Sequence, residues 1–177
     1  MSSPLINIQP LSQPVDIPDE MASFSPEVEA EIDRHLAKYP VMRSAILPLM
    51  FIVQRERGGY LDPAGVAYLA KRLALRITDI WEVATFYSMI HIEPIGKYHI
   101  QICRTLSCKI RGAGKITEHC IQKLGIKPGE TTADGRFTLS EVECLGSCGT
   151  APMLQTNFDY HEDLTPEKVD QILDALP

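Results

Sequence analysis

Hydrophobic residues recur at helical spacing through the first half of the chain. In one stretch Ile80, Val83, Ala84 and Tyr87 fall on a single helical face. Four helical segments are predicted in this half, over about residues 25–38, 43–57, 62–73 and 78–87. Their ends carry suitable residues, such as Ser25-Pro26 at the first start and Gly58-Gly59 after the second segment. Four short helices with short connections favour a small antiparallel bundle over residues 25–92.

The pattern changes to alternation near residue 97. Tyr98, Ile100 and Ile102 alternate with polar residues in a predicted strand that runs directly into Cys103. The other elements expected here are a helix over 111–124, a strand over 137–142, a hairpin of 153–155 with 158–160, and a helix from Thr165-Pro166. This order predicts an α/β sandwich over residues 96–177. The chain as a whole is expected to be of the mixed α+β or α/β class.

Residues 1–24 carry four prolines and no basic residue, a composition that resists helix formation and predicts an extended arm. Six aliphatic residues make this arm more apolar than most disordered tails. A disordered tail and a strap that orders on a partner surface are both open interpretations.

The composition limits the partners of the chain. With 177 residues it forms one large domain or two small ones, and its net charge of -6 argues against nucleic acid as the main partner. The longest apolar run, 45–53, is far shorter than the roughly 18 to 20 residues of a membrane span. The first basic residue is Arg34, so no secretory or transit signal is visible and the protein is expected to be cytosolic.

Four of the five cysteines form two close pairs. Cys103 and Cys108 are separated by four residues, and Cys144 and Cys148 by three. A disulfide framework is disfavoured by the 45% hydrophobic content and the odd number of cysteines. The four-residue spacing of the first pair occurs in plant-type two-iron ferredoxins, whereas structural zinc prefers two-residue knuckles. The spacing therefore favours a [2Fe-2S] cluster, with a four-cysteine zinc site as the alternative.

The other candidate groups have structural interpretations. Cys120 shares the apolar stripe of its predicted helix and is expected in the core. His99 is placed on the polar face of its strand and His119 on the surface or at a cap. Trp81 and Phe86 are expected to serve packing. The Gly- and Lys-containing segment 112–115 lacks the remaining residues of a phosphate-binding loop, so no nucleotide site is recognised.

At the cysteine motifs the chain resembles a known family. The segment Cys103-Arg-Thr-Leu-Ser-Cys108 and the segment from Glu143-Cys144-Leu-Gly-Ser-Cys148 to Ala151-Pro152-Met153 are similar to those of the thioredoxin-like [2Fe-2S] subunit of respiratory complex I, the NuoE type. The segments 82–87 and 160–167 also resemble that family. The resemblance runs from about Ser25 to the C-terminus. It implies a helical N-terminal part followed by a thioredoxin-like ferredoxin domain whose cluster is held by Cys103, Cys108, Cys144 and Cys148.

The resemblance also implies the partners. A [2Fe-2S] cluster takes one electron at a time, whereas NADH gives up two together, so a flavin must divide the pair. The expected partner is the FMN- and NADH-binding flavoprotein subunit of bacterial NADH:quinone oxidoreductase, with other subunits of the peripheral arm, at the cytoplasmic side of the membrane. The chain alone is not expected to be catalytic. The alternatives are the diaphorase part of an NAD-linked hydrogenase or formate dehydrogenase, and a zinc module that serves as a scaffold.

Overall fold

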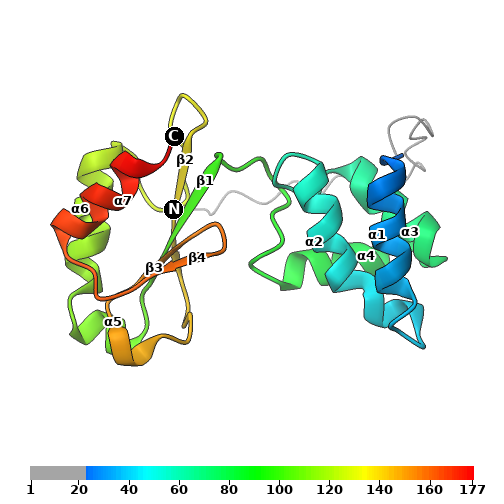
Figure 1. The fold of residues 1–177 in the computed structure, drawn as a ribbon, viewed down its shortest axis with the longest axis horizontal. Helices are drawn as coiled ribbons and strands as arrows, with labels where there is room; N and C mark the ends of the chain where they lie inside the picture. Colours follow the sequence, from blue (N-terminus) through cyan, green and yellow to red (C-terminus); the bar gives the residue numbers. More distant parts are fainter. Residues whose placement is uncertain (1–22) are drawn as a thin grey trace, which may run out of the picture. The chain divides into compact units, whose positions relative to one another are not determined.

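The structure is a computed structural model that describes residues 23–177. It combines helices with a four-stranded sheet, as the predicted mixed class requires. The described residues divide into two compact units (Figure 1). The helical unit contains residues 23–57 and 61–90, and the sheet unit contains 58–60 and 91–177. The predicted arm, residues 1–24, lies outside the described residues except for its last two positions.

The helical unit is built from α1 (Pro26–Leu36), the 3-10 helix η2 (Met42–Ala45), α2 (Ile46–Glu56), α3 (Pro63–Leu73) and α4 (Ile77–Phe86). Ser25 and Asp62 cap α1 and α3 by accepting the backbone N–H of Val28 and Gly65, as their sequence positions predict. The helices share one apolar core, in which Leu49, Met50 and Leu69 have no exposed surface. Among the described helices, none is long and apolar enough to cross a membrane.

Two predictions for this unit are wrong in detail. Helix α4 begins at Ile77 and not at Thr78-Asp79, because the Asp79 carboxylate lies in the first turn and accepts the backbone N–H of Arg76 at 3.1 Å. Phe86 is 80% exposed, so it does not serve packing within residues 23–177, whereas Trp81 packs against the core.

The sheet unit has the strand order β2-β1-β3-β4. The strands are β1 (Tyr98–Cys103), β2 (Phe137–Val142), β3 (Leu154–Thr156) and β4 (Asp159–His161). β1 and β2 are parallel, and β3 and β4 add to the other side of β1 as an antiparallel hairpin. Helices α6 (Ala113–Leu124) and α7 (Pro166–Ala175) lie side by side against the sheet (Figure 1), and their apolar residues complete its core.

The predicted elements of the sheet unit are present with two differences. The predicted helix over 111–124 starts at Ala113, after Gly112 adopts a left-handed conformation with φ of 99°. A separate short helix before it, α5 (Leu106–Ile110), was not predicted. The hairpin is shifted by one residue because Asn157, with φ of 54°, forms the turn instead of closing β3.

Candidate metal centre

The parallel pairing of β1 and β2 brings both cysteine pairs to one edge of the sheet. Cys103 is the last residue of β1 and stands opposite Val142, the last residue of β2. Cys144 follows two residues after Val142. The first cysteine loop (residues 103–112) and the second cysteine loop (residues 143–153) therefore leave the sheet side by side, as loops beyond parallel strands do.

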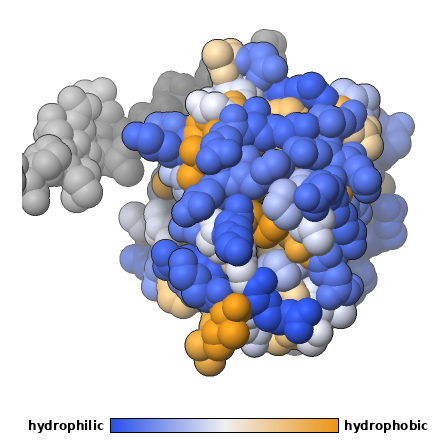
Figure 2. Space-filling view, turned by 90° about the vertical axis from the view of Figure 1, so that its left-hand side faces the viewer, coloured by the Kyte–Doolittle hydropathy of each residue, from blue (hydrophilic) through white to orange (hydrophobic). Residues whose placement is uncertain are grey.

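The first cysteine loop contains two buried thiols. Cys103 and Cys108 are each 2% exposed, and Cys108 lies on the inner side of α5. The opposite side of α5 carries Leu106 and Ile110, which are 75% and 76% exposed. Figure 2 views the sheet unit from the side of its helices, where hydrophilic residues dominate and hydrophobic ones gather at the lower edge. The short helix thus shields two thiols with one face and exposes apolar surface with the other.

The second cysteine loop contains two exposed thiols that lie close together. The sulfur atoms of Cys144 and Cys148 are 3.7 Å apart. Two sulfurs bound to one tetrahedral metal at about 2.3 Å would be roughly 3.7 to 3.8 Å apart. Between them Gly146 has φ of 87°, which allows its N–H to reach the Cys144 sulfur at 3.4 Å. The loop holds this pair at the separation that a shared metal needs.

Within each pair one thiol is more acidic than usual and the other less. Burial would raise the pKa of Cys103, but hydrogen bonds from the Thr105 hydroxyl and the Leu145 N–H hold its pKa below the usual value. The Gly146 N–H lowers the pKa of Cys144. Burial raises the pKa of Cys108 to about 11, and the neighbouring Cys144 raises that of Cys148. Each pair therefore provides one favoured thiolate, and the thiolate is the form that binds metal.

Hydrogen bonds join the two loops at the sulfurs. From the second loop, the N–H groups of Leu145 and Met153 reach the sulfurs of Cys103 and Cys108. From the first loop, the hydroxyls of Thr105 and Ser107 reach those of Cys144 and Cys148. Sequence reasoning missed both hydroxyls, although their position inside the first cysteine motif was a signal. Each loop thus supplies donors to the other loop's thiols.

The four predicted ligands come together as two pairs rather than as one cage. In residues 23–177 no three His, Cys, Asp or Glu side chains surround a single metal position. A cluster of two irons needs two thiolates for each iron, and the arrangement of the four cysteines fits this requirement.

A contact network holds the second cysteine loop on the hairpin side. The Tyr160 hydroxyl donates to the carbonyl oxygen of Leu145 at 2.7 Å. The Thr150 hydroxyl donates to the Glu162 carboxylate at 2.8 Å, and the Asp163 N–H donates to the Thr150 carbonyl at 2.7 Å. Tyr160, Glu162 and Asp163 lie in the segment 160–167, whose sequence resembles the family, and their role is to fix the loop.

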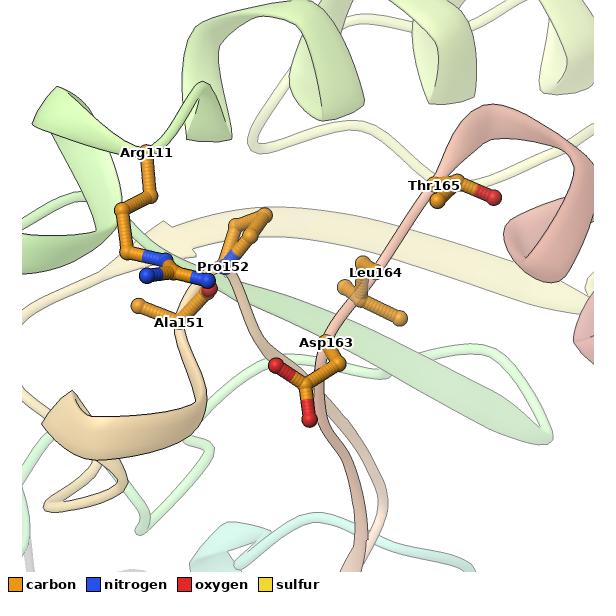
Figure 3. Close-up of a pocket in the computed structure, with 6 residues that line it drawn as sticks. All are labelled: Arg111, Ala151, Pro152, Asp163, Leu164 and Thr165. Carbon is orange, nitrogen blue, oxygen red and sulfur yellow. The ribbon is translucent and has the colours of Figure 1, made fainter.

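A pocket of about 420 Å³ lies where this segment meets both loops. Figure 3 shows its six lining residues: Arg111, Ala151, Pro152, Asp163, Leu164 and Thr165. The Arg111 guanidinium reaches across from the first loop, and its Nε–H donates to the carbonyl oxygen of Ala151 at 2.5 Å. The peptide bond between Ala151 and Pro152 is cis.

The residues predicted to be structural lie away from these loops' thiols. Cys120 has no exposed surface within the α6 core, and burial raises the pKa of its thiol to about 12. This confirms its core position. His99 is not on a polar face but is buried, with its Nε2 2.8 Å from the Ser140 hydroxyl, because β1 is covered on both faces. His119 pairs with Asp170 of α7 at 2.9 Å.

Comparison with known proteins identifies relatives over most of the chain. The model of the thioredoxin-like [2Fe-2S] ferredoxin family matches residues 32–177. The NADH-quinone oxidoreductase E subunit of Rickettsia conorii is 50% identical over 143 residues, which are 80% of this chain and 86% of the relative. The second NADH-quinone oxidoreductase E subunit of Rhizobium meliloti is 43% identical over 146 residues, or 82% and 86%.

A solved structure shares the fold. An NAD+-reducing [NiFe]-hydrogenase in the air-oxidized state matches with a TM-score of 0.62 and 23% identity. The match covers 73% of this chain and 24% of the hydrogenase chain. At this identity the likeness concerns the fold alone.

Proposed function

The chain belongs to the thioredoxin-like [2Fe-2S] ferredoxin family, and on that premise we propose that it is the electron-transfer subunit of an NADH:quinone oxidoreductase. The observation that carries the proposal is the meeting of two cysteine pairs at one sheet edge, with the Cys144 and Cys148 sulfurs 3.7 Å apart. Relatives up to 50% identical are named as the E subunit of that complex.

We propose Cys103, Cys108, Cys144 and Cys148 as the ligands of a [2Fe-2S] cluster. When bound, the cluster accepts and releases one electron at a time. The chain's own groups prepare the site for it. The N–H groups of Leu145 and Met153 reach the buried sulfurs, and such donors favour the more negative, reduced form. Burial of Cys103 and Cys108 keeps water from one side, while exposed Cys144 and Cys148 leave the other side open to a partner.

The proposed electron donor is a separate flavoprotein subunit that binds FMN and NADH. A hydride carries two electrons, and a flavin can accept both and pass them on singly. The exposed second cysteine loop is where such a flavoprotein would exchange electrons with the cluster. We place the assembly in the peripheral arm at the cytoplasmic side of a bacterial membrane. Within it, residues 25–92 and 96–177 are proposed as separate domains, with the cluster in the second.

The diaphorase part of an NAD-linked hydrogenase is the second candidate. Its support is the fold match to an NAD+-reducing hydrogenase, at 23% identity. The relatives from quinone oxidoreductases match at roughly twice that identity and over most of their length, which favours the quinone oxidoreductase.

The test begins with the full chain purified without oxygen. We expect two irons and two acid-labile sulfides per chain, and an EPR signal from one unpaired electron after reduction with dithionite. One zinc per chain without sulfide would contradict the proposal and support a scaffold module. Isolation of the native complex through a tag on this chain then identifies the large subunits: a quinone-reducing membrane arm supports the first candidate, and a hydrogenase subunit the second.

A kinetic experiment tests the division of roles. The isolated chain should not oxidise NADH with an artificial acceptor, whereas addition of the FMN-binding subunit should give NADH-dependent reduction of the cluster. NADH oxidation by the chain alone, without flavin, would contradict the proposal.

A further inference from the structure

Arg111 connects the two cysteine loops beyond their last cysteines. It follows α5 directly and stands three residues after Cys108. Its Nε–H donates to the carbonyl oxygen of Ala151, which stands three residues after Cys148 and has no exposed surface (Figure 3). One side chain therefore joins backbone segments that are 40 residues apart in the sequence.

The backbone after Ala151 contacts both buried cysteines. The Met153 N–H reaches the Cys108 sulfur, and the Met153 carbonyl accepts the backbone N–H of Cys103 at 3.2 Å. Only Pro152 separates Ala151 from Met153. Because the proline ring fixes φ, the orientation of the Ala151 carbonyl is coupled to that of the Met153 amide.

The other arginine between the loops is bound differently. Arg104 pairs with the Glu143 carboxylate at 2.6 Å, and their side chains are 56% and 72% exposed. An exposed ion pair of this kind contributes little to structure, since water competes for both groups. The partner of Arg111 is a buried carbonyl, for which a lost donor is not replaced as readily by water.

We infer that Arg111 is a positioning residue for the cluster: through the Ala151 carbonyl it holds the Met153 amide on the Cys108 sulfur. The inference rests on the proposed function, because it assumes that this sulfur is a cluster ligand. The relevant atom of Arg111 is the Nε donor rather than the positive charge. A lysine at this position keeps the charge but places a methylene where Nε stands.

The test compares Arg111→Lys with Arg104→Lys in the full chain carrying its cluster. Both variants keep the charge, and only the first removes the donor to Ala151. We measure the EPR g values of the reduced protein, the visible circular dichroism of the oxidised protein and the rate of iron release to a chelator. Arg111→Lys should shift the spectra and release iron at least about threefold faster than wild type, the order expected for one lost hydrogen bond. Arg104→Lys should match wild type in all three measurements.

The outcomes separate this inference from the proposed function. If wild type carries the cluster and Arg111→Lys matches it in spectra and release rate, Arg111 does not position the cluster. If Arg111→Lys fails to fold, Arg111→Gln tests the same contact by the same measurements, and wild-type behaviour in that variant overturns the inference. If wild type itself holds no iron and sulfide, the proposed function has failed first.

Discussion

The hydroxyl of Tyr160 donates to the carbonyl oxygen of Leu145, at 2.7 Å. This bond ties β4 to the turn between Cys144 and Cys148, the exposed half of the candidate centre. Leu145 also supplies the N–H that reaches the Cys103 sulfur, so the same peptide segment is held from one side and donates on the other.

Loss of the Tyr160 hydroxyl is expected to loosen the second cysteine loop. Tyr160→Phe removes one partly exposed hydrogen bond, worth about 0.5 to 1 kcal/mol, which corresponds to a two- to fivefold faster release of iron to a chelator. Tyr87→Phe, in the helical unit, is the matched control and should release iron at the wild-type rate. Equal rates for all three proteins would show that the Tyr160 contact does not hold the loop.

The ligand assignment predicts a sharp difference among the five cysteines. Serine at position 103, 108, 144 or 148 should abolish the cluster or change its EPR and visible spectra, because an alkoxide is a poorer ligand than a thiolate for iron. Cys120→Ser should keep the spectra unchanged. It should lower the free energy of unfolding by about 1 to 3 kcal/mol, since it buries a hydroxyl in an apolar core.

The two classes of variant are compared by iron content, spectra and chemical unfolding. An unaltered spectrum in any of the four proposed ligand variants would contradict the assignment. Loss of the cluster in Cys120→Ser alone would move the site to α6.

Positive charges near the first loop should raise the reduction potential, because reduction adds a negative charge to the centre. Arg104→Gln and Lys109→Gln are each expected to lower the potential by tens of millivolts at low salt, on a scale where about 59 mV is a tenfold change for one electron. Arg104 pairs with exposed Glu143, so adding Glu143→Gln to Arg104→Gln should restore most of its shift. Redox titration followed by EPR checks both statements.

Unchanged potentials in the two single variants at low salt, with the cluster intact, would mean that solvent screens these charges. Backbone donors and burial would then be the features that set the potential.

Local sequence signals predicted the elements that depend on neighbouring residues. Ser25 and Asp62 cap helices as expected, and the alternation of Tyr98, Ile100 and Ile102 predicted β1 to its last residue. These features need only a capping side chain or a period of two, which a short window of sequence contains.

The features that were missed depend on contacts between distant segments. Helix α5 has only five residues, too few for a helical period, and it is placed by the thiol that it turns inward. His99 alternates with apolar residues as an exposed residue would, but its strand is central in the sheet and buried on both faces. The donors from Thr105, Ser107 and Met153 to the cysteine sulfurs require the parallel pairing of β1 with β2. No local pattern reports these contacts.

The buried His99 predicts a loss of stability in mild acid. Burial lowers the pKa of its imidazole to about 4, and the neighbouring His91 ring, with its centroid 4.8 Å away, adds to the effect. The neutral ring is held by the Ser140 hydroxyl at 2.8 Å. In the unfolded chain the pKa of a histidine is about 6.5, so the unfolded state binds the extra proton first as the pH falls.

The sign follows from this order of proton binding: the contribution of His99 to stability is fully present above about pH 6.5 and is lost as the pH falls toward 4. Between pH 8 and pH 5 the loss from this one group should be about 2 kcal/mol. Urea unfolding of wild type and His99→Gln at several pH values measures it. Acid effects on the cluster and on other histidines are common to both proteins, so the difference between their pH profiles isolates His99. We expect the profile of His99→Gln to be flatter by about that amount, and parallel profiles would show that His99 takes up its proton equally in the folded and unfolded chain.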